Sequence, residues 1–559
     1  MFIFIGLIIF WISIFSIKLF IENKFQVDEK YSLPIVFTLI GIIEFILGIL
    51  NLLLMGTLLI IALSLIYFII LIKNKNITIN KIKEYFNNPT KLIISILFIY
   101  ITFVSLSMHL THYDNFSHWG LIIKTMFQYN RLPNFENNYI FFKGYQPGSA
   151  SFIYYIGTLL GKTEQSMIIG HNYLILSYFT ILFNNIKKDK YKNIVLVIAF
   201  YLFISATSTI GFNDLLVDVL ISLQLVSALI IMNNYKDNIK KAFIYTLPIY
   251  IYLYLVKNTG LLFDILLSIY LIYLSFKNKN IKEGIKYSII SFLISIFFLL
   301  IWQNHVTLVY GHWALNTKHN LSVQNYYSTF TTSGINHITN FISLYIKHIF
   351  SLNITSIYFI IFNILGIIFI SLTNKSNKKL LITLDIIYLL YVILLGILYI
   401  FSFPWEEAKV FAGYNRYIMT ILFVLIGIFI NYIITYKNKF NYKTIYIIII
   451  SILLLIPIYR EYNCFSTLLG NDHYNNSYVE KFDKMIKYIP KDKDKYYIYV
   501  NDPNIDKYFI EHLATYKLLK NNIEVIDNLD QIENNSYIIL FNKTSNKDLN
   551  KVNKFVLEK

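Results

Sequence analysis

The segment HYDNFSHW, residues 112–119, holds the first residues whose types and spacing suggest chemistry. Asp114 and His118 are four residues apart, so a helix here would place both side chains on one face. A carboxylate beside an imidazole can act as a general base or help to hold a divalent cation. Asp114 would also make a good N-cap where a helix leaves the membrane, and the segment alone does not decide between these roles.

Two more acids and a lysine stand at the ends of apolar segments. Asp214 and Asp218, in GFNDLLVDVLISL, share a helical face, and Asp218 lies about one turn inside the apolar run. An acid at that depth predicts a polar cavity or a structural pair with a cation on a neighbouring helix. Lys257, in LVKNTGLL, occupies a very short connection, where both snorkelling and the binding of a phosphate would account for it.

The segment PWEEAKVFAGYNRYIMT contributes Glu406, Arg416 and Tyr417. The guanidinium of Arg416 offers a planar fork of donors that matches phosphate oxygens, whereas a lysine would act as a point charge. An ion pair with Glu406 or Glu407 is the simpler role for this arginine. Both roles stay open at this point.

The elements that must position these residues are membrane helices. Of 559 residues, 56% are hydrophobic and only 14% are charged, more apolar surface than a soluble domain of this length can bury. Hydropathy predicts about fourteen spans, and the chain is expected to be an all-α polytopic membrane protein with 13–14 transmembrane helices. The approximate spans are 2–19, 32–51, 54–72, 92–110, 165–183, 194–210, 217–233, 242–256, 260–276, 287–303, 354–373, 380–401, 416–434 and 443–459, with a further short piece around 150–160.

Charge in the connections predicts the orientation of the spans. Short lysine-rich connections at 73–83, 187–192, 236–241, 277–286, 374–379 and 436–443 alternate with connections that are not lysine-rich. The positive-inside rule places the lysine-rich set in the cytoplasm, so every candidate residue named above falls on the external face of the plasma membrane. The net charge of +17 follows from this distribution, and it gives no indication of a nucleic-acid partner.

Composition changes at about residue 460, which separates the region 460–559 from the membrane helices before it. In the last region, charge and asparagine increase, and KYYIYVNDPN, NIEVIDN and SYIILFN predict strands around a helix near 504–520, forming a small extracytoplasmic α/β domain. A single cysteine excludes disulfides within the chain and cysteine-based metal sites. His305, His312 and His319 lie in the loop 304–353 at a spacing of seven, which could suggest a metal repeat. Because there are no partner cysteines and no tight histidine pair, we expect a loop that closes over a substrate rather than a metal site.

The segment YDNFSHWGLIIKTMFQYNRLPN, followed by YQPGSASFIYYIGTLLG, resembles the first external loop of the GT-C superfamily of membrane glycosyltransferases. Asp114 matches the acid of that loop, HWGLIIKTMFQYNRLP its surface helix, and Pro147 the proline of the following segment. NDLLVDVLISL, LVKNTGLL and YNRYIMTIL are similar to later segments of bacterial surface-polysaccharide members. The resemblance covers residues 93–435. Asn115 stands where typical members have a second acid, and the acidic loop follows the fourth span rather than the first. The resemblance therefore implies that the first three helices, in residues 1–91, are an addition to a transmembrane catalytic module at 92–459.

The resemblance implies a GT-C-like fold and a hexosyl- or pentosyltransferase that works at the outer face of the membrane. The donor would be a polyprenyl-phosphate-linked sugar and the acceptor a cell-surface glycan or glycoconjugate. Asp114 would be the catalytic base, and Lys257 and Arg416 would stabilise the departing lipid phosphate. The predicted substrate-binding residues are His118, Trp119, Asp214, Asp218, Lys257, Glu406, Arg416 and Tyr417.

Several alternatives remain open from the sequence. No cofactor is established, and a requirement for Mg²⁺ or Mn²⁺ is left undecided. A polysaccharide polymerase or ligase would act on diphosphate-linked repeat units through arginines in a large external loop, and the loop 304–353 has none. A flippase or transporter of a lipid-linked glycan would be expected to show internal repeats, which the sequence does not display convincingly.

Overall fold

Helices make up most of the chain. The computed structural model describes residues 2–187, 191–208, 211–315, 334–372, 378–436, 449–453, 455, 459, 466–490, 493–528, 532 and 536–541. The main helices of the bundle are α1 (Phe2–Phe25), α2 (Glu29–Ile49), α3 (Leu53–Lys73), α5 (Pro89–Ser105), α8 (Glu164–Asn184), α9 (Asn193–Thr207), α10 (Asp218–Asn234), α11 (Ile239–Val256), α12 (Gly260–Lys277), α13 (Ile281–Tyr310), α16 (Ile354–Leu372), α17 (Lys378–Ser402) and α19 (Tyr414–Thr435).

The predicted polytopic architecture is confirmed. Within the described ranges, ten helices are long and apolar enough to cross a membrane, or eleven if α5 and the bent helix before it count as one span. With the shorter apolar helices α9 and α10, they correspond to every predicted span except 443–459, most of which lies outside the described residues. The chain is therefore a multi-pass, largely α-helical protein.

Shorter helices connect these spans. They are α4 (Ile79–Phe86), the π-helical segment η1 (Asn115–Trp119), α6 (Gly120–Tyr129), α7 (Gly148–Leu160), the 3₁₀ segment η3 (His312–Leu315), α15 (Gly334–Ile349) and α18 (Trp405–Ala408). Helix α7 is the short piece anticipated around 150–160, and η1 with α6 forms the helix anticipated after Asp114. Asn130, directly after the last residue of α6, adopts a left-handed conformation with φ of 56°, which asparagine tolerates more readily than most residues.

The first three helices pack as part of the same bundle as the rest. Thr38 on α2 hydrogen-bonds Tyr178 on α8 at 2.5 Å, and Ser13 on α1 hydrogen-bonds Tyr155 on α7 at 2.6 Å. Each of these four side chains is buried. The boundary that the resemblance implies at residue 91 therefore separates helices that share one core.

The C-terminal region contains a small α/β domain, as the sequence predicts. Its strands β1 (Lys495–Tyr499), β2 (Ile523–Ile526) and β3 (Ser536–Leu540) form a parallel sheet in the order β2-β1-β3. Helix α23 (Lys507–Leu518) connects β1 to β2, and α22 (Tyr478–Met485) with the 3₁₀ turn η6 (Ile486–Tyr488) precedes the sheet. Asp506 caps α23 by accepting hydrogen bonds from the backbone amides of Tyr508 and Phe509.

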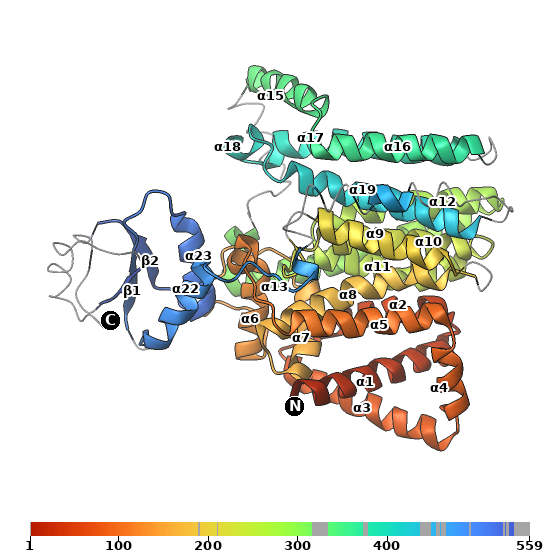
Figure 1. Ribbon diagram of the computed structural model, residues 1–559, viewed down its shortest axis with the longest axis horizontal. Helices are drawn as coiled ribbons and strands as arrows, with labels where there is room; N and C mark the ends of the chain where they lie inside the picture. The colour runs from red at the N-terminus through yellow and green to blue at the C-terminus, as the bar shows by residue number, and fades with distance from the viewer. Residues whose placement is uncertain are drawn as a thin grey trace.

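This domain is attached to one end of the bundle, opposite the turn between α3 and α4 (Figure 1). Lys124 on α6 donates from Nζ to the carbonyl oxygens of Tyr516 and Lys517, at 2.8 and 3.1 Å, and so satisfies the C-terminal end of α23. Lys517 in turn pairs with Glu164 at 3.0 Å and Asp483 at 2.8 Å. The domain thus lies against the segment that carries η1 and α6.

Candidate functional site

Four ionisable side chains from distant parts of the sequence meet at the end of the bundle that carries the α/β domain. We call Asp114, Asp218, Lys257 and Arg416 the ionic cluster. Arg416 Nη1 donates to Asp114 Oδ2 at 2.7 Å, and Arg416 Nε lies 3.6 Å from Asp218 Oδ2. Lys257 Nζ donates to Asp218 Oδ1 at 2.7 Å. The cluster is an alternating chain of two carboxylates and two cations.

Helix ends supply all four members. Asp114 immediately precedes η1, Asp218 is the first residue of α10, Lys257 follows the last residue of α11, and Arg416 lies in the first turn of α19. The turn at Lys257 depends on Gly260, because a Cβ there would collide with the carbonyl group of Leu253. That close approach keeps the Lys257 side chain directly beside α10 and α19.

A hydrogen bond between a side chain and a backbone amide joins η1 to the loop before α10. Asn115 Oδ1 accepts a hydrogen bond from the amide of Leu215 at 2.9 Å, and both residues are buried. The π-helical turn widens the helix at this point, and such turns recur at functional sites. Asn115, which departs from the family pattern, therefore has a structural role in holding Asp114 next to Asp218.

The structure excludes some of the structural roles that the sequence left open. Asp114 makes no capping hydrogen bond to η1, and its carboxylate is directed to Arg416 instead. Lys257 does not extend to the surface as a snorkelling lysine would, since its amine pairs with Asp218. Asp218 both pairs with cations and lines a cavity, so its two proposed roles occur together.

Glu406 lies outside the ionic cluster, in contrast to its predicted place in the site. Its side chain is 75% exposed and pairs with Lys409, three residues along the chain. The helix that carries it, α18, is a single turn, so Glu406 and Arg416 belong to separate elements. No ion pair between Arg416 and Glu406 is present among the described contacts.

The charges of the cluster follow from burial and neighbours. Burial opposes ionisation of Asp114, but the positive charges near it, with Arg416 in direct contact, outweigh burial and hold the pKa of Asp114 below its ordinary value. Burial lowers the pKa of His118 to about 3, so His118 is neutral near pH 7 and Arg416 is the cation that keeps Asp114 ionised. Burial also raises the pKa of Asp214 to about 8, helped by the nearby acids Asp218 and Asp114. Asp214 is therefore mostly protonated at neutral pH.

Aromatic rings lie beside the cluster. The Tyr417 ring lies 5.2 Å from Lys257 Nζ and 5.3 Å from the Arg416 guanidinium carbon, so both cations contact its π face. His118 packs edge to face against Tyr145 at 5.2 Å, and Trp119 lies 5.8 Å from the same ring. His118 also hydrogen-bonds Ser117 through Nδ1 at 2.7 Å, which fixes the orientation of the imidazole. Tyr417 thus contacts both cations of the cluster and His118 lies near Asp114, whereas Trp119 packs against His118 and Tyr145.

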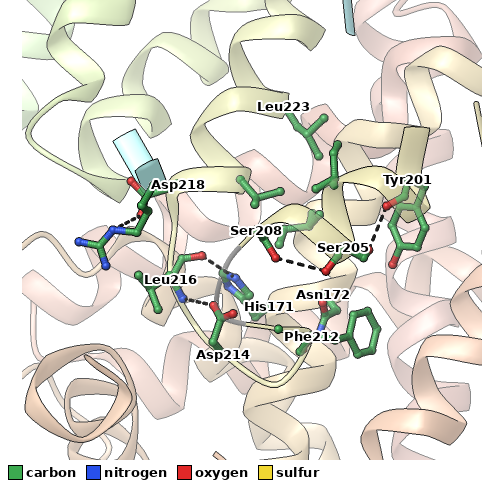
Figure 2. Close-up of a pocket in the computed structure, with 15 residues that line it drawn as sticks. His171, Asn172, Tyr201, Ser205, Ser208, Phe212, Asp214, Leu216, Asp218 and Leu223 are labelled. Atoms are coloured by element: carbon green, nitrogen blue, oxygen red, sulfur yellow. Dashed lines mark hydrogen bonds and ion pairs between the residues drawn. The ribbon is translucent and has the colours of Figure 1, made fainter. Parts of the chain in front are cut away.

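A small cavity of about 50 Å³ opens beside the cluster, between α8, α9 and α10. Figure 2 shows Asp214, Asp218 and His171 around it, with Asp214 accepting from the amide of Leu216 at 2.8 Å. His171 Nε2 contacts the carbonyl oxygen of Leu216 at 3.0 Å. The volume suffices for a few water molecules, and its polar wall gives those waters hydrogen-bonding partners.

Helix α23 of the α/β domain packs on the segment that carries Asp114. Phe509 and Tyr516 contact Phe116 at ring-centroid distances of 5.8 and 5.2 Å, and His512 contacts Tyr113 at 5.0 Å. Sequence reasoning missed these contacts, because residues about 400 positions apart carry no pairing signal in a single sequence. The domain therefore supports the position of Asp114.

The described residues contain no group of three His, Cys, Asp or Glu side chains that could hold a metal ion. At the cluster itself, Asp114 and Asp218 already pair with Arg416 and Lys257, so the residues present do not fit a divalent cation. Among the loop histidines, His305 stacks on Trp302 at 5.4 Å and His312 begins η3. His319 lies outside the described residues.

Comparison with known proteins identifies no matching family model, no matching curated protein and no matching solved structure. The geometry of the cluster and the sequence patterns that locate it are therefore the only indications of function.

Proposed function

We propose that this chain is an integral-membrane glycosyltransferase that transfers a sugar from a polyprenyl-phosphate-linked donor to a cell-surface glycan or glycoconjugate. The single observation that carries the proposal is the ionic cluster. One carboxylate, Asp114, stands within hydrogen-bonding distance of a guanidinium that is itself linked through Asp218 to a lysine. A base next to two cations is the arrangement that displacement of a phosphate by a hydroxyl requires.

The reaction assigns one task to each half of the cluster. An acceptor hydroxyl attacks the anomeric carbon, so a new carbon–oxygen bond forms while the bond between that carbon and the phosphate oxygen breaks. The hydroxyl proton passes to the Asp114 carboxylate. The bonding electrons leave with the polyprenyl phosphate, whose additional negative charge Lys257 and Arg416 stabilise.

Donor binding would also change the basicity of Asp114. With Arg416 paired to it, Asp114 is ionised but a weak base, because the cation stabilises the charged form. A donor phosphate that draws Arg416 away removes this stabilisation and makes Asp114 a stronger base. The base is thus activated only when the leaving group is in place.

The position of the cluster agrees with a lipid-linked donor. It lies at the end of the helical bundle, where the predicted external connections 111–149, 211–216, 257–259 and 402–415 begin or end. Placement outside the membrane rests on the lysine-rich connections and the positive-inside rule. A donor at this level would keep its isoprenoid tail in the bilayer and its phosphate at the helix ends.

The test supplies purified protein with a polyprenyl-phosphoryl sugar and an acceptor glycan, and measures release of the lipid phosphate. We expect Asp114→Asn to abolish release while the protein keeps its wild-type elution profile and helical content. Glu406→Gln is the matched control, since it neutralises an exposed acid outside the cluster and should retain activity. Full activity in Asp114→Asn, or no release by the wild-type protein with any sugar donor of this class, would refute the proposal.

A further inference from the structure

Helix α4 lies nearly at a right angle to the helix that follows it. The bend between α4 and α5 is 86°, and α5 corresponds to the predicted span 92–110. The sequence accounts for this bend, because Asn88 caps α5 by accepting from the amide of Thr90 at 3.0 Å and Pro89 is the first residue of α5. Helix α4 therefore runs close to the plane of a membrane that α5 crosses, at the end of the bundle opposite the α/β domain (Figure 1).

One face of α4 is apolar and remains uncovered by the described part of the chain. Ile79, Ile82 and Phe86 are spaced as i, i+3 and i+7, which places them on one face of the helix. These residues are 72%, 47% and 51% exposed, and α4 contains no buried residue. In a helix at a membrane surface, such a face enters the boundary between headgroups and acyl chains.

Positive charge surrounds this apolar face. The lysines on and before the helix are Lys73, Lys75, Lys81 and Lys83, and all four are exposed. Lys81 and Lys83 stand on either side of Ile82, whereas Glu84, the only acid in 73–86, lies on the opposite face of the helix. Lys81 Nζ donates to the carbonyl oxygen of Asn76 at 3.0 Å. None of the four lysines pairs with an acid among the ion pairs of the described residues.

The positive-inside rule accounts for lysines at this place but not for a separate helix. The lysine-rich connections 236–241 and 277–286 are turns that lead directly into α11 and α13, whereas 73–83 leads into α4. A contact between two copies of the chain through this face would bring their lysines together, which like-charge repulsion opposes. A negatively charged surface with an apolar interior suits both the lysines and the apolar face.

We propose that α4 binds the surface of a lipid leaflet that contains anionic phospholipids. Ile79, Ile82 and Phe86 enter among the acyl chains, and the four lysines bind the phosphates of the headgroups. In the predicted orientation this is the cytoplasmic leaflet, where anionic lipids give the surface a negative potential. The contact lies at the opposite end of the bundle from the ionic cluster, so it does not depend on the proposed transfer reaction.

The depth of a fluorescent probe in the full-length protein, reconstituted in lipid nanodiscs, tests the insertion of α4. Cys464 is the only cysteine, so a Cys464→Ser background allows a single labelled cysteine at Ile82→Cys or at Glu84→Cys. We expect lipids with brominated acyl chains to quench the probe at position 82, and aqueous acrylamide to quench the probe at position 84. Quenching of both probes by acrylamide alone would overturn the proposal. Protection of position 82 from both quenchers would also overturn it, because a protein partner would then cover the face.

The preference for anionic headgroups is tested with the same probe at position 82. Spin-labelled phosphatidylglycerol should quench it several-fold more effectively than spin-labelled phosphatidylcholine, and added NaCl should reduce the difference. Each lysine near an anionic surface contributes about fivefold to lipid affinity. The combined variant Lys73→Gln, Lys75→Gln and Lys83→Gln should therefore lose most of the preference.

The matched control removes three exposed lysines from another lysine-rich connection, by the substitutions Lys236→Gln, Lys240→Gln and Lys241→Gln. This variant should retain the preference for phosphatidylglycerol at position 82. Equal quenching by the two lipids in the protein with all its lysines, or an equal loss of preference in the two triple variants, would contradict the assignment. Since neither readout measures sugar transfer, failure of the transferase proposal leaves both tests unaffected.

Discussion

Replacing Asp218 by asparagine should destabilise the protein substantially, because this carboxylate is shared by two cations. Asp218 lies 2.7 Å from Lys257 and 3.6 Å from Arg416, and its side chain is only 12% exposed. Removing one partner of a buried ion pair costs about 3–5 kcal/mol. Lys257 and Arg416 are 21% and 24% exposed, and Arg416 keeps Asp114, so we expect the lower end, about 3 kcal/mol.

A double-mutant cycle separates the ion pair from other effects of the substitution. The variants are Asp218→Asn, Lys257→Met and the combination of both. Since removal of both partners leaves no buried charge unpaired, the double variant should be more stable than the sum of the single losses predicts, by about 2 kcal/mol. The assay is denaturant titration of the purified protein in mixed micelles, followed by tryptophan fluorescence. Single effects that add to within about 0.5 kcal/mol would refute the pairing.

Two further predictions concern the surroundings of the cluster. Asp214 has its pKa raised by burial from 3.8 to about 8, so the folded state binds the proton more tightly than the unfolded state, and the wild-type protein should lose stability relative to Asp214→Asn as pH rises from about 4 to about 8. Unfolding midpoints of both proteins across this range test it, and a difference independent of pH would contradict it. Lys517→Met would leave Glu164 and Asp483 without the lysine they share, so we expect docking of the α/β domain to weaken by about 3 kcal/mol and limited proteolysis to release the domain faster. Unchanged release would show that other contacts hold the domain.

The membrane helices could be predicted from local sequence because each span must satisfy its backbone polar groups by hydrogen bonds within its own helix. A span needs about 20 apolar residues, and that requirement is visible in a window such as 380–401, which lies within α17. The α/β domain was also predictable from short segments, because a strand shows alternating apolar and polar residues and a helix shows apolar residues at helical spacing. The shorter helices were less clear, and α7 has only 13 residues, which fits neither a full span nor a loop.

The composition of the candidate site was only partly predictable. A charged residue at the end of an apolar run, such as Asp218, is unusual enough to be recognised from its position alone. The same signal selected Glu406, which the structure leaves exposed and paired with Lys409. Asn115 and Tyr145, which hold and border the cluster, carry no such signal, because an amide and a phenol are common in loops.

What the sequence by itself determined is a set of apolar helices and the few ionisable residues at their ends, and the charge of the connections predicts the orientation of the helices. Only the tertiary structure decided that Arg416 pairs with Asp114 and not with Glu406. It also decided that Asp218 is shared by Lys257 and Arg416. The physical reason is that hydrophobicity acts on each helix separately, whereas ion pairs depend on which helix ends the packing brings within a few ångströms.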